Sequence, residues 1–183
     1  MPYLGLGVAL VIVLAAVIAY NRGAGHPSPA AGAVAPSRAP ISGEEQQAIE
    51  PGSHIQSGSR GHWTSDPPTS GQHYPVAAAW GYTAQRLPPE TWVHNLEHGG
   101  VVVLYSCPDG CPADVAAVRR FIESAPPDPQ FGSVKLVNAP YPVPGHRFAV
   151  LSWGWRLFMD SWDPQAALAF YTRHVDHAPE ALP

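Results

Sequence analysis

Residues 92–105, Trp-Val-His-Asn-Leu-Glu-His-Gly-Gly-Val-Val-Val-Leu-Tyr, decide how this chain folds. The second half of the stretch, residues 101–105, is apolar and rich in β-branched side chains, which predicts a buried strand. The paired glycines before it leave the backbone free to turn sharply into that strand. His94, Glu97 and His98 are therefore expected at the start of a core strand, where they could bind a metal, act as acid and base, or hold a loop in place.

The spacing of His94 and His98 decides whether they can share one metal ion. On a helix, residues four apart are neighbours. On a strand they share a face, but a rise of about 3.3 Å per residue separates them by roughly 13 Å. That separation is too large for one ion bound at about 2.0–2.1 Å from each nitrogen. Because glycines directly after a helix suit its end, a shared site predicts one helical turn over residues 93–98.

The composition of the 183-residue chain predicts one folded domain with additional segments. Apolar residues make up 45% of the chain, which is enough for a core, whereas charged residues make up 13% and the net charge is −4. A chain without a basic surface is not expected to bind nucleic acid. The 22 prolines and 17 glycines predict a fold that is rich in loops.

Two segments are expected to precede the folded domain. Residues 1–21 contain a continuous apolar run from Leu4 to Tyr20, which is interpreted as an uncleaved transmembrane anchor, with a cleaved signal peptide as the alternative. Residues 22–50 are dominated by Ala, Pro, Gly and Ser, so they predict a flexible linker. The folded domain then covers residues 51–183.

Two cysteines bear on the cellular location of this domain. Arg22, which follows the apolar run, gives no support for export under the positive-inside rule. Cys107 and Cys111 are separated by turn residues that would let them form a disulfide, although a redox pair or a metal-binding pair is an alternative. Because disulfides persist outside the cytosol, the chain is expected in the cell membrane as a single-pass protein with an extracytoplasmic C-terminal domain.

Residues 51–90 contain so many glycines and prolines that neither a helix nor a long strand is expected there. The segment nevertheless carries several aromatic residues together with His54, His62 and His73. A long loop with its own aromatic anchors is usually functional. Its sharpest part, Pro-Pro-Thr-Ser-Gly-Gln-His-Tyr at 67–74, would present His73 from a stiff turn.

The remaining segments alternate between predicted helices and strands. Helices are expected at about residues 113–124 and 165–174. Strands are expected at residues 134–137 and over residues 148–158, the latter as one strand or as a hairpin that bends near Gly154. This order predicts an α+β fold with a small mixed β-sheet, two main helices and a long irregular N-terminal region rich in Pro and Gly, all preceded by the transmembrane helix.

Several motifs in the domain together resemble those of the DUF3105 family. They are His54, the octapeptide at 67–74, Gly81-Tyr82, His-Asn-Leu-Glu-His-Gly-Gly-Val-Val at 94–102, Ser-Trp-Gly at 152–154, Asp160 and Pro179-Glu180. The resemblance covers about residues 50–181, so the domain at 51–183 is DUF3105-like. It implies a membrane-anchored prokaryotic protein with an extracytoplasmic domain of unassigned function, and it supplies no reaction.

The histidines form the candidate site, which is expected to bind a transition metal, either copper or zinc. Met159 near three or four histidines would favour copper, whereas Glu97 as a ligand would favour zinc. The expected ligands are His73, His94, His98 and His54, and the residues expected beside them are Glu97, Tyr74 and Glu180.

Two other functions stay open. In the first, the histidines are structural and pin the loop at residues 51–90 onto the sheet of a metal-free module in a membrane complex. In the second, His-x-x-Glu-His is the motif of a zinc hydrolase whose glutamate activates water, although that motif needs a continuous helix and paired glycines follow it here. No residue is assigned a catalytic role, so enzymatic activity is left open. A membrane protein or a metal carrier is the expected partner.

Overall fold

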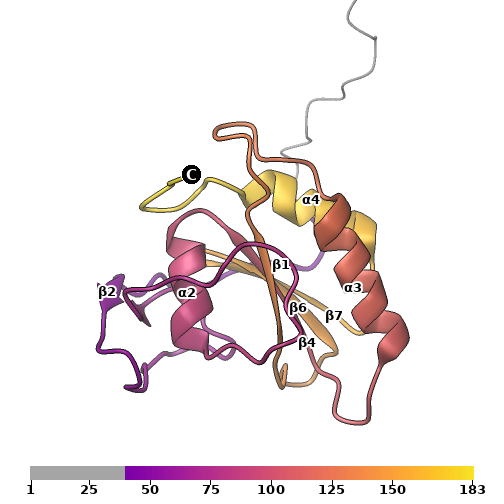
Figure 1. Cartoon of the computed structure of the whole chain (residues 1–183), viewed down its shortest axis with the longest axis horizontal. Helices are drawn as coiled ribbons and strands as arrows, with labels where there is room; N and C mark the ends of the chain where they lie inside the picture. Colours follow the sequence, from indigo (N-terminus) through magenta and orange to yellow (C-terminus); the bar gives the residue numbers. More distant parts are fainter. Residues whose placement is uncertain (1–39) are drawn as a thin grey trace, which may run out of the picture. The chain divides into compact units, whose positions relative to one another are not determined.

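The computed structural model describes residues 40–183. A five-stranded mixed sheet with the order β1-β7-β6-β4-β5 forms its centre, and β2 and β3 form a separate parallel pair (Figure 1). The strands are β1 (Glu44–Gln46), β2 (Ser53–His54), β3 (Gln72–His73), β4 (Val101–Tyr105), β5 (Leu136–Pro140), β6 (Phe148–Ser152) and β7 (Trp155–Met159).

Strand β4 has the predicted bounds and organises the sheet. It pairs in parallel with β5 and antiparallel with β6. Strands β6 and β7 form a hairpin whose turn contains Gly154 with φ +73°, a backbone conformation that favours glycine. The hairpin alternative for residues 148–158 is therefore confirmed.

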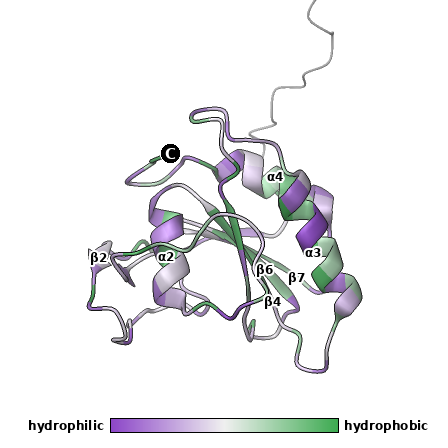
Figure 2. Cartoon of the chain, viewed as in Figure 1, coloured by the Kyte–Doolittle hydropathy of each residue, from purple (hydrophilic) through white to green (hydrophobic). Residues whose placement is uncertain are grey.

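Three helices cover the two faces of the sheet. They are α2 (Pro89–Glu97), α3 (Pro112–Ser124) and α4 (Pro164–His174). Val101 and Val103 of β4 pack with α3 and α4 in one core cluster, whereas Val102 and Leu104 pack with α2 in the other. Because both faces of β4 are covered, its sequence is an uninterrupted apolar run, and Figure 2 shows apolar strands between the helices.

The α+β class with a mixed sheet is confirmed, but the described residues contain one more main helix than predicted. The helical turn expected at residues 93–98 is the end of α2, which begins at Pro89. Proline is tolerated in the first turn because the first N–H groups of a helix have no partner within it. The proline density that argued against a helix therefore marks where this helix begins.

The predicted linker at residues 22–50 extends too far toward the C-terminus. Residues 44–46 form β1, which pairs antiparallel with β7 at the edge of the sheet. Glu44 holds this strand in place, since its carboxylate lies 3.0 Å from Nε2 of His174 and 3.1 Å from Nε of Arg173. These contacts come from α4, so no local pattern in the sequence indicated them.

The expected membrane anchor at residues 1–21 lies outside the described residues. Among residues 40–183, no helix combines the length and the apolar character needed to cross a bilayer. The predicted location as a single-pass protein of the cell membrane is corrected on this finding.

Candidate metal centre

Helix α2 holds one half of the centre and ends abruptly at its paired glycines. The N–H groups of Gly99 and Gly100 donate to the carbonyls of Leu96 and Asn95, at 3.0 and 2.8 Å. Gly99 has φ +81°, and a Cβ there would meet Cα of Asp176 at 2.8 Å. Glycine is therefore required for this helix end.

The same helix places three candidate residues on one face. His94, Glu97 and His98 are related by three and four positions, so their side chains are neighbours. The strand alternative, which would have separated the two imidazoles, is excluded because all of residues 89–97 are helical.

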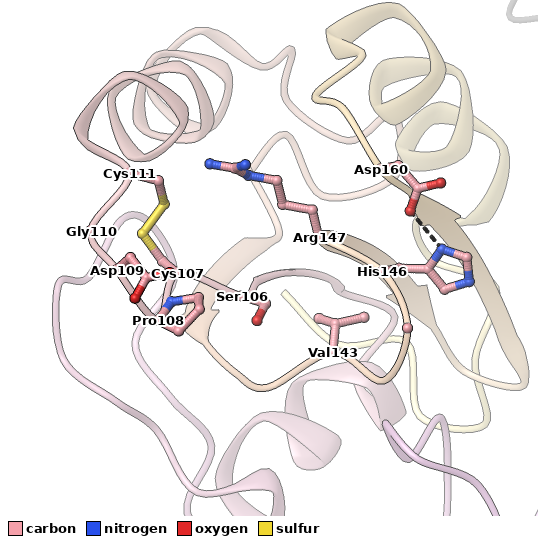
Figure 3. A pocket seen from close by; sticks show the side chains of 11 residues that line it. Ser106, Cys107, Pro108, Asp109, Gly110, Cys111, Val143, His146, Arg147 and Asp160 are labelled. Carbon is pink, nitrogen blue, oxygen red and sulfur yellow. Dashed lines mark hydrogen bonds and ion pairs between the residues drawn. A yellow bond between two sulfur atoms is a disulfide. The ribbon is translucent and has the colours of Figure 1, made fainter.

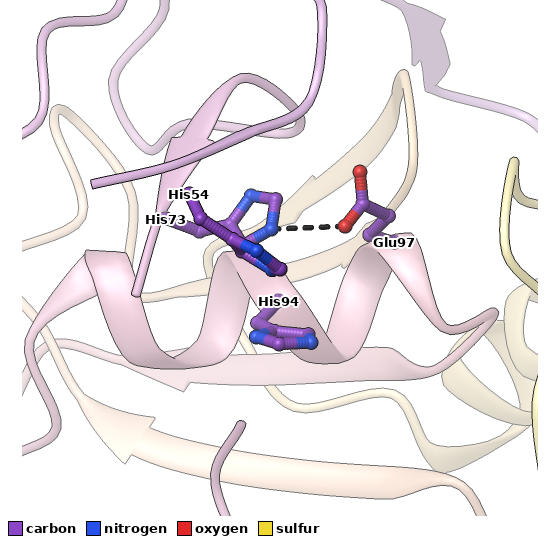
Figure 4. A group of neighbouring side chains, drawn as sticks. All are labelled: His54, His73, His94 and Glu97. Carbon is purple, nitrogen blue, oxygen red and sulfur yellow. Dashed lines mark ion pairs between the residues drawn. The ribbon is translucent and has the colours of Figure 1, made fainter. Parts of the chain in front are cut away.

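The N-terminal loop supplies the other half. The backbone N–H of Tyr74 donates to the carbonyl of Glu90 at 2.8 Å, which holds the residues after β3 against α2. Strands β2 and β3 are in register at His54 and His73. Their side chains reach the same space as those of α2, as Figure 4 shows for His54, His73, His94 and Glu97.

His54, His73, His94 and Glu97 form a group that could hold a metal ion. Each offers one ligand atom, and these atoms all lie within 4.8 Å of one another. Ligands at about 2.0–2.1 Å from a tetrahedral ion are about 3.3 Å apart, so the widest pair would have to close by about 1.5 Å. His54 is exposed and the other three residues are buried, which leaves the group one side open to solvent.

Hydrogen bonds fix which nitrogen each buried histidine presents. Nδ1 of His73 lies 2.8 Å from the carbonyl oxygen of Gly71, and Nδ1 of His94 lies 2.6 Å from that of Tyr74. A carbonyl only accepts, so each Nδ1 carries the proton and donates it. Nε2 of each neutral ring then carries the lone pair. That of His73 faces Glu97, whereas that of His94 accepts from Nε2–H of His98 at 3.0 Å, a hydrogen bond that a bound metal would replace.

The contact between His73 and Glu97 indicates that a proton or a cation lies between the two side chains. Nε2 of His73 lies 2.9 Å from Oε2 of Glu97, and the side chains are 1% and 10% exposed. With Nδ1 already donating to Gly71, both facing atoms are acceptors when the ring is neutral. Either a second proton or a cation must therefore lie between them. Glu97, expected beside the ligands or as a ligand that would favour zinc, lies among the donor atoms.

His98 lies next to this group but outside it. Its Nε2 is 3.0 Å from Nε2 of His94 and 3.9 Å from Oε2 of Glu180. The C-terminal tail reaches the centre because the N–H of Glu180 donates to the carbonyl of Glu97 at 3.1 Å. The backbone carbonyl of Tyr74 and the carboxylate of Glu180 thus lie beside His94 and His98.

Burial disfavours protonation of the two histidines on α2. Burial lowers the pKa of His94 below its ordinary value of 6.5, and the nearby His73 and His54 lower it further. Burial and the neighbouring His94 likewise lower the pKa of His98. Neutral imidazole is the form that binds metals, so these shifts favour coordination over protonation.

Sequence reasoning missed two residues that shape the centre. A Cβ at Gly52 would lie 1.9 Å from Oε1 of Glu97, so the carboxylate rests against this backbone. The side chain of Asn95 accepts from the N–H of Ala78 and donates to its carbonyl, at 2.8 and 2.9 Å, and so fixes the loop over α2. The Pro51-Gly52 pair was the available signal, but it was interpreted only as a break in regular structure.

The other predicted features lie elsewhere. Cys107 and Cys111 form the predicted disulfide, beyond the opposite end of β4 from His98. Met159 ends β7 and packs against the core shared with α3 and α4. It therefore does not supply the sulfur that would have favoured copper.

Comparison with known proteins gives one match. A family model described as "Protein of unknown function (DUF3105)" matches residues 54–182, which contain the whole histidine group. No curated protein and no solved structure matches the chain.

Proposed function

We propose, from the premise that the chain belongs to the DUF3105 family, that its domain binds one transition metal ion through His54, His73, His94 and Glu97. The observation that carries the proposal is the 2.9 Å approach of His73 Nε2 to Glu97 Oε2 in a buried setting. A metal ion between these atoms would satisfy both lone pairs and would also engage Nε2 of His94.

The alternative occupant of that space is a proton. It would turn His73 into an imidazolium that is buried against a carboxylate, and burying such a pair costs desolvation energy that its attraction repays only with good geometry. Nε2 of His73 and Nε2 of His94 both lie near the Glu97 carboxylate, and the pKa of His94 is already lowered. These features support metal coordination over simple protonation.

The donor set favours zinc over copper. Three imidazole nitrogens and one carboxylate oxygen are ordinary zinc ligands. Copper(I) prefers soft sulfur ligands, and neither Met159 nor the cysteine pair belongs to the group. Four protein donors fill a tetrahedral shell, which suits a held or transferred ion. Because His54 is exposed, the ion has a path to solvent.

A zinc hydrolase fits the geometry less well. In that mechanism Glu97 would face a metal-bound water and remove its proton. Its carboxylate instead contacts His73 and rests against Gly52. As a ligand, Glu97 is unavailable as the base.

The test is metal retention by the full 183-residue chain. The protein is offered Zn(II), Cu(II) and Cu(I) in separate samples, desalted, and analysed by mass spectrometry for bound metal. We expect about one zinc per chain in the wild type and less than about a tenth of that in His94→Ala, since ligand loss costs at least the 10–100-fold of a lost supporting contact. His146→Ala is the matched control because its ring is exposed and bonds to Asp160. A wild type that retains none of the three ions refutes the proposal.

One observation favours a second candidate, a metal-free module whose histidines are structural. The Nδ1 bonds of His73 and His94 tie the backbone at residues 71 and 74 to the centre. Under this reading, His73→Ala lowers the thermal midpoint equally with and without chelator. Under metal binding, the loss is larger in the presence of zinc, because the ligand stabilises only the wild type.

A further inference from the structure

A second polar site lies beyond the carboxyl end of β4, where the disulfide opens onto a cavity of about 560 Å³. The cavity is lined by Cys107, Cys111, His146 and Arg147, among others (Figure 3). In that view the guanidinium of Arg147 points toward the disulfide, whereas His146 turns away to Asp160. None of these residues belongs to the histidine group.

The position of the pair in the fold is informative. Strand β4, helix α3 and strand β5 form a crossover unit with parallel strands. Cys107 lies in the connection after β4, and Cys111 is the N-cap residue of α3. Oxidoreductases such as thioredoxin carry their cysteine pair in a βαβ setting. Here the spacing is one residue longer, as Cys-Pro-Asp-Gly-Cys.

The two sulfur atoms are not equivalent. Cys111 is 8% exposed, whereas Cys107 is half-buried and followed by the exposed residues 108–110. An incoming thiolate therefore has better access to Cys107. Attack there makes Cys111 the leaving group.

The surroundings of Cys111 stabilise such a leaving group. Its side chain makes no capping hydrogen bond to α3, so a released thiolate could accept from the N–H groups of the first turn. The helix N-terminus carries partial positive charge. Arg147 lines the same cavity and forms an ion pair with Asp114 of that turn at 2.5 Å, so the cation and the carboxylate largely offset each other and the helix N-terminus is the feature that favours the thiolate.

We propose that Cys107 and Cys111 form a thiol–disulfide exchange site that oxidises the dithiol of a protein or peptide bound at this cavity. A substrate thiolate attacks Sγ of Cys107, the Cys107–Cys111 bond breaks, and its electron pair leaves on Cys111. The second substrate thiolate then attacks the substrate sulfur of the mixed disulfide and releases Cys107. Two electrons pass from the substrate to the cysteine pair. The two substrate protons end on the cysteine thiols or in solvent.

The test mixes the oxidised full chain with a reduced synthetic peptide that contains two cysteines. Peptide disulfide and protein dithiol are quantified by alkylation and mass spectrometry. We expect one peptide disulfide per protein dithiol, at a rate at least about tenfold above that of an equal concentration of oxidised glutathione. A rate no higher than that of glutathione overturns the proposal and leaves the disulfide as a structural crosslink. This measurement needs no variant, so it is decisive even if cysteine substitutions impair folding.

Single-cysteine variants test the assigned roles. Cys111→Ser should trap a mixed disulfide with the oxidised peptide at Cys107, at least about tenfold faster than Cys107→Ser traps one at Cys111. Equal rates would overturn the assignment of Cys107 as the attacked sulfur. Exchange should run at the same rate before and after treatment with a metal chelator, so failure of the metal proposal and failure of this one give different results.

Discussion

Gly52→Ala tests the metal centre without changing any ligand. The new Cβ would lie 1.9 Å from Oε1 of Glu97 and 3.1 Å from its Cδ, whereas an ordinary contact begins at 3.4 Å. Oε1 must therefore move by about 1.5 Å, and because the carboxylate is rigid this carries Oε2, the oxygen that faces His73, away from the 2.0–2.2 Å that zinc requires. Gly52 has no left-handed φ, so alanine does not strain the backbone itself.

The expected loss follows from displacement of this one ligand. Removing a supporting contact of a metal site typically weakens binding 10–100-fold, so displacing the Glu97 carboxylate should raise the zinc Kd by at least about tenfold, or about 1.4 kcal/mol. Competition against a chromophoric chelator measures this Kd. Ser53→Ala, a change at the next, exposed position, is the control and should bind as the wild type does.

A double-mutant cycle identifies the cause. If Gly52→Ala acts by displacing the carboxylate, it should add nothing to Glu97→Ala, because no carboxylate remains to displace. Additive effects, or a Gly52→Ala protein with wild-type affinity, would refute the reasoning that Glu97 is a ligand held against this backbone.

Three further predictions concern stability. Lys135→Met should lower the free energy of unfolding by about 3–5 kcal/mol in urea, because it leaves the Asp176 carboxylate without its cationic partner in a buried ion pair. Arg119→Ala breaks an exposed pair and should barely move the midpoint. Asp163→Ala removes the side chain that caps α4 through two backbone N–H groups and should cost about 1 kcal/mol, measured in the same way. Burial lowers the pKa of His174 below 6.5 in the folded protein. The unfolded chain therefore binds this proton first, and the stability of the fold falls as the pH drops below about 6.5. Thermal midpoints at about pH 7.5 and 5.5 should differ less in His174→Gln than in the wild type.

The elements that sequence predicted well are those with local patterns. The apolar run at residues 101–105 and the periodic apolar residues of α3 and α4 indicate their own structure, because a buried strand and an amphipathic helix each need one kind of repeat. Strand β1 has no such repeat. Its place depends on pairing with β7 and on the contact of Glu44 with His174, both of which join segments far apart in the sequence.

In the candidate site, too, some contacts follow from local sequence patterns and others do not. The proximity of His94 and His98 followed from helical spacing alone. His54 and His73 were expected at one site, but the parallel pairing of two strands of two residues each that brings them together has no local signal in the sequence. The direction of the Glu97 side chain depends on Gly52 and on His73 together, and neither is near it in sequence.

The helix half and the loop half of the centre also differ in how firmly their backbones are held. The backbone at the end of α2 is fixed from the far side, because the N–H of Asp176 donates to Gly99 at 2.9 Å and the N–H of Glu180 donates to Glu97 at 3.1 Å. The loop half is held by short strands, and its outermost residue, His54, is exposed. A closing movement of about 1.5 Å, which a tetrahedral ion needs, is therefore easier for the loop than for the helix. In the proposed site, His54 belongs to the half that can yield, so an ion could enter without disturbing β4.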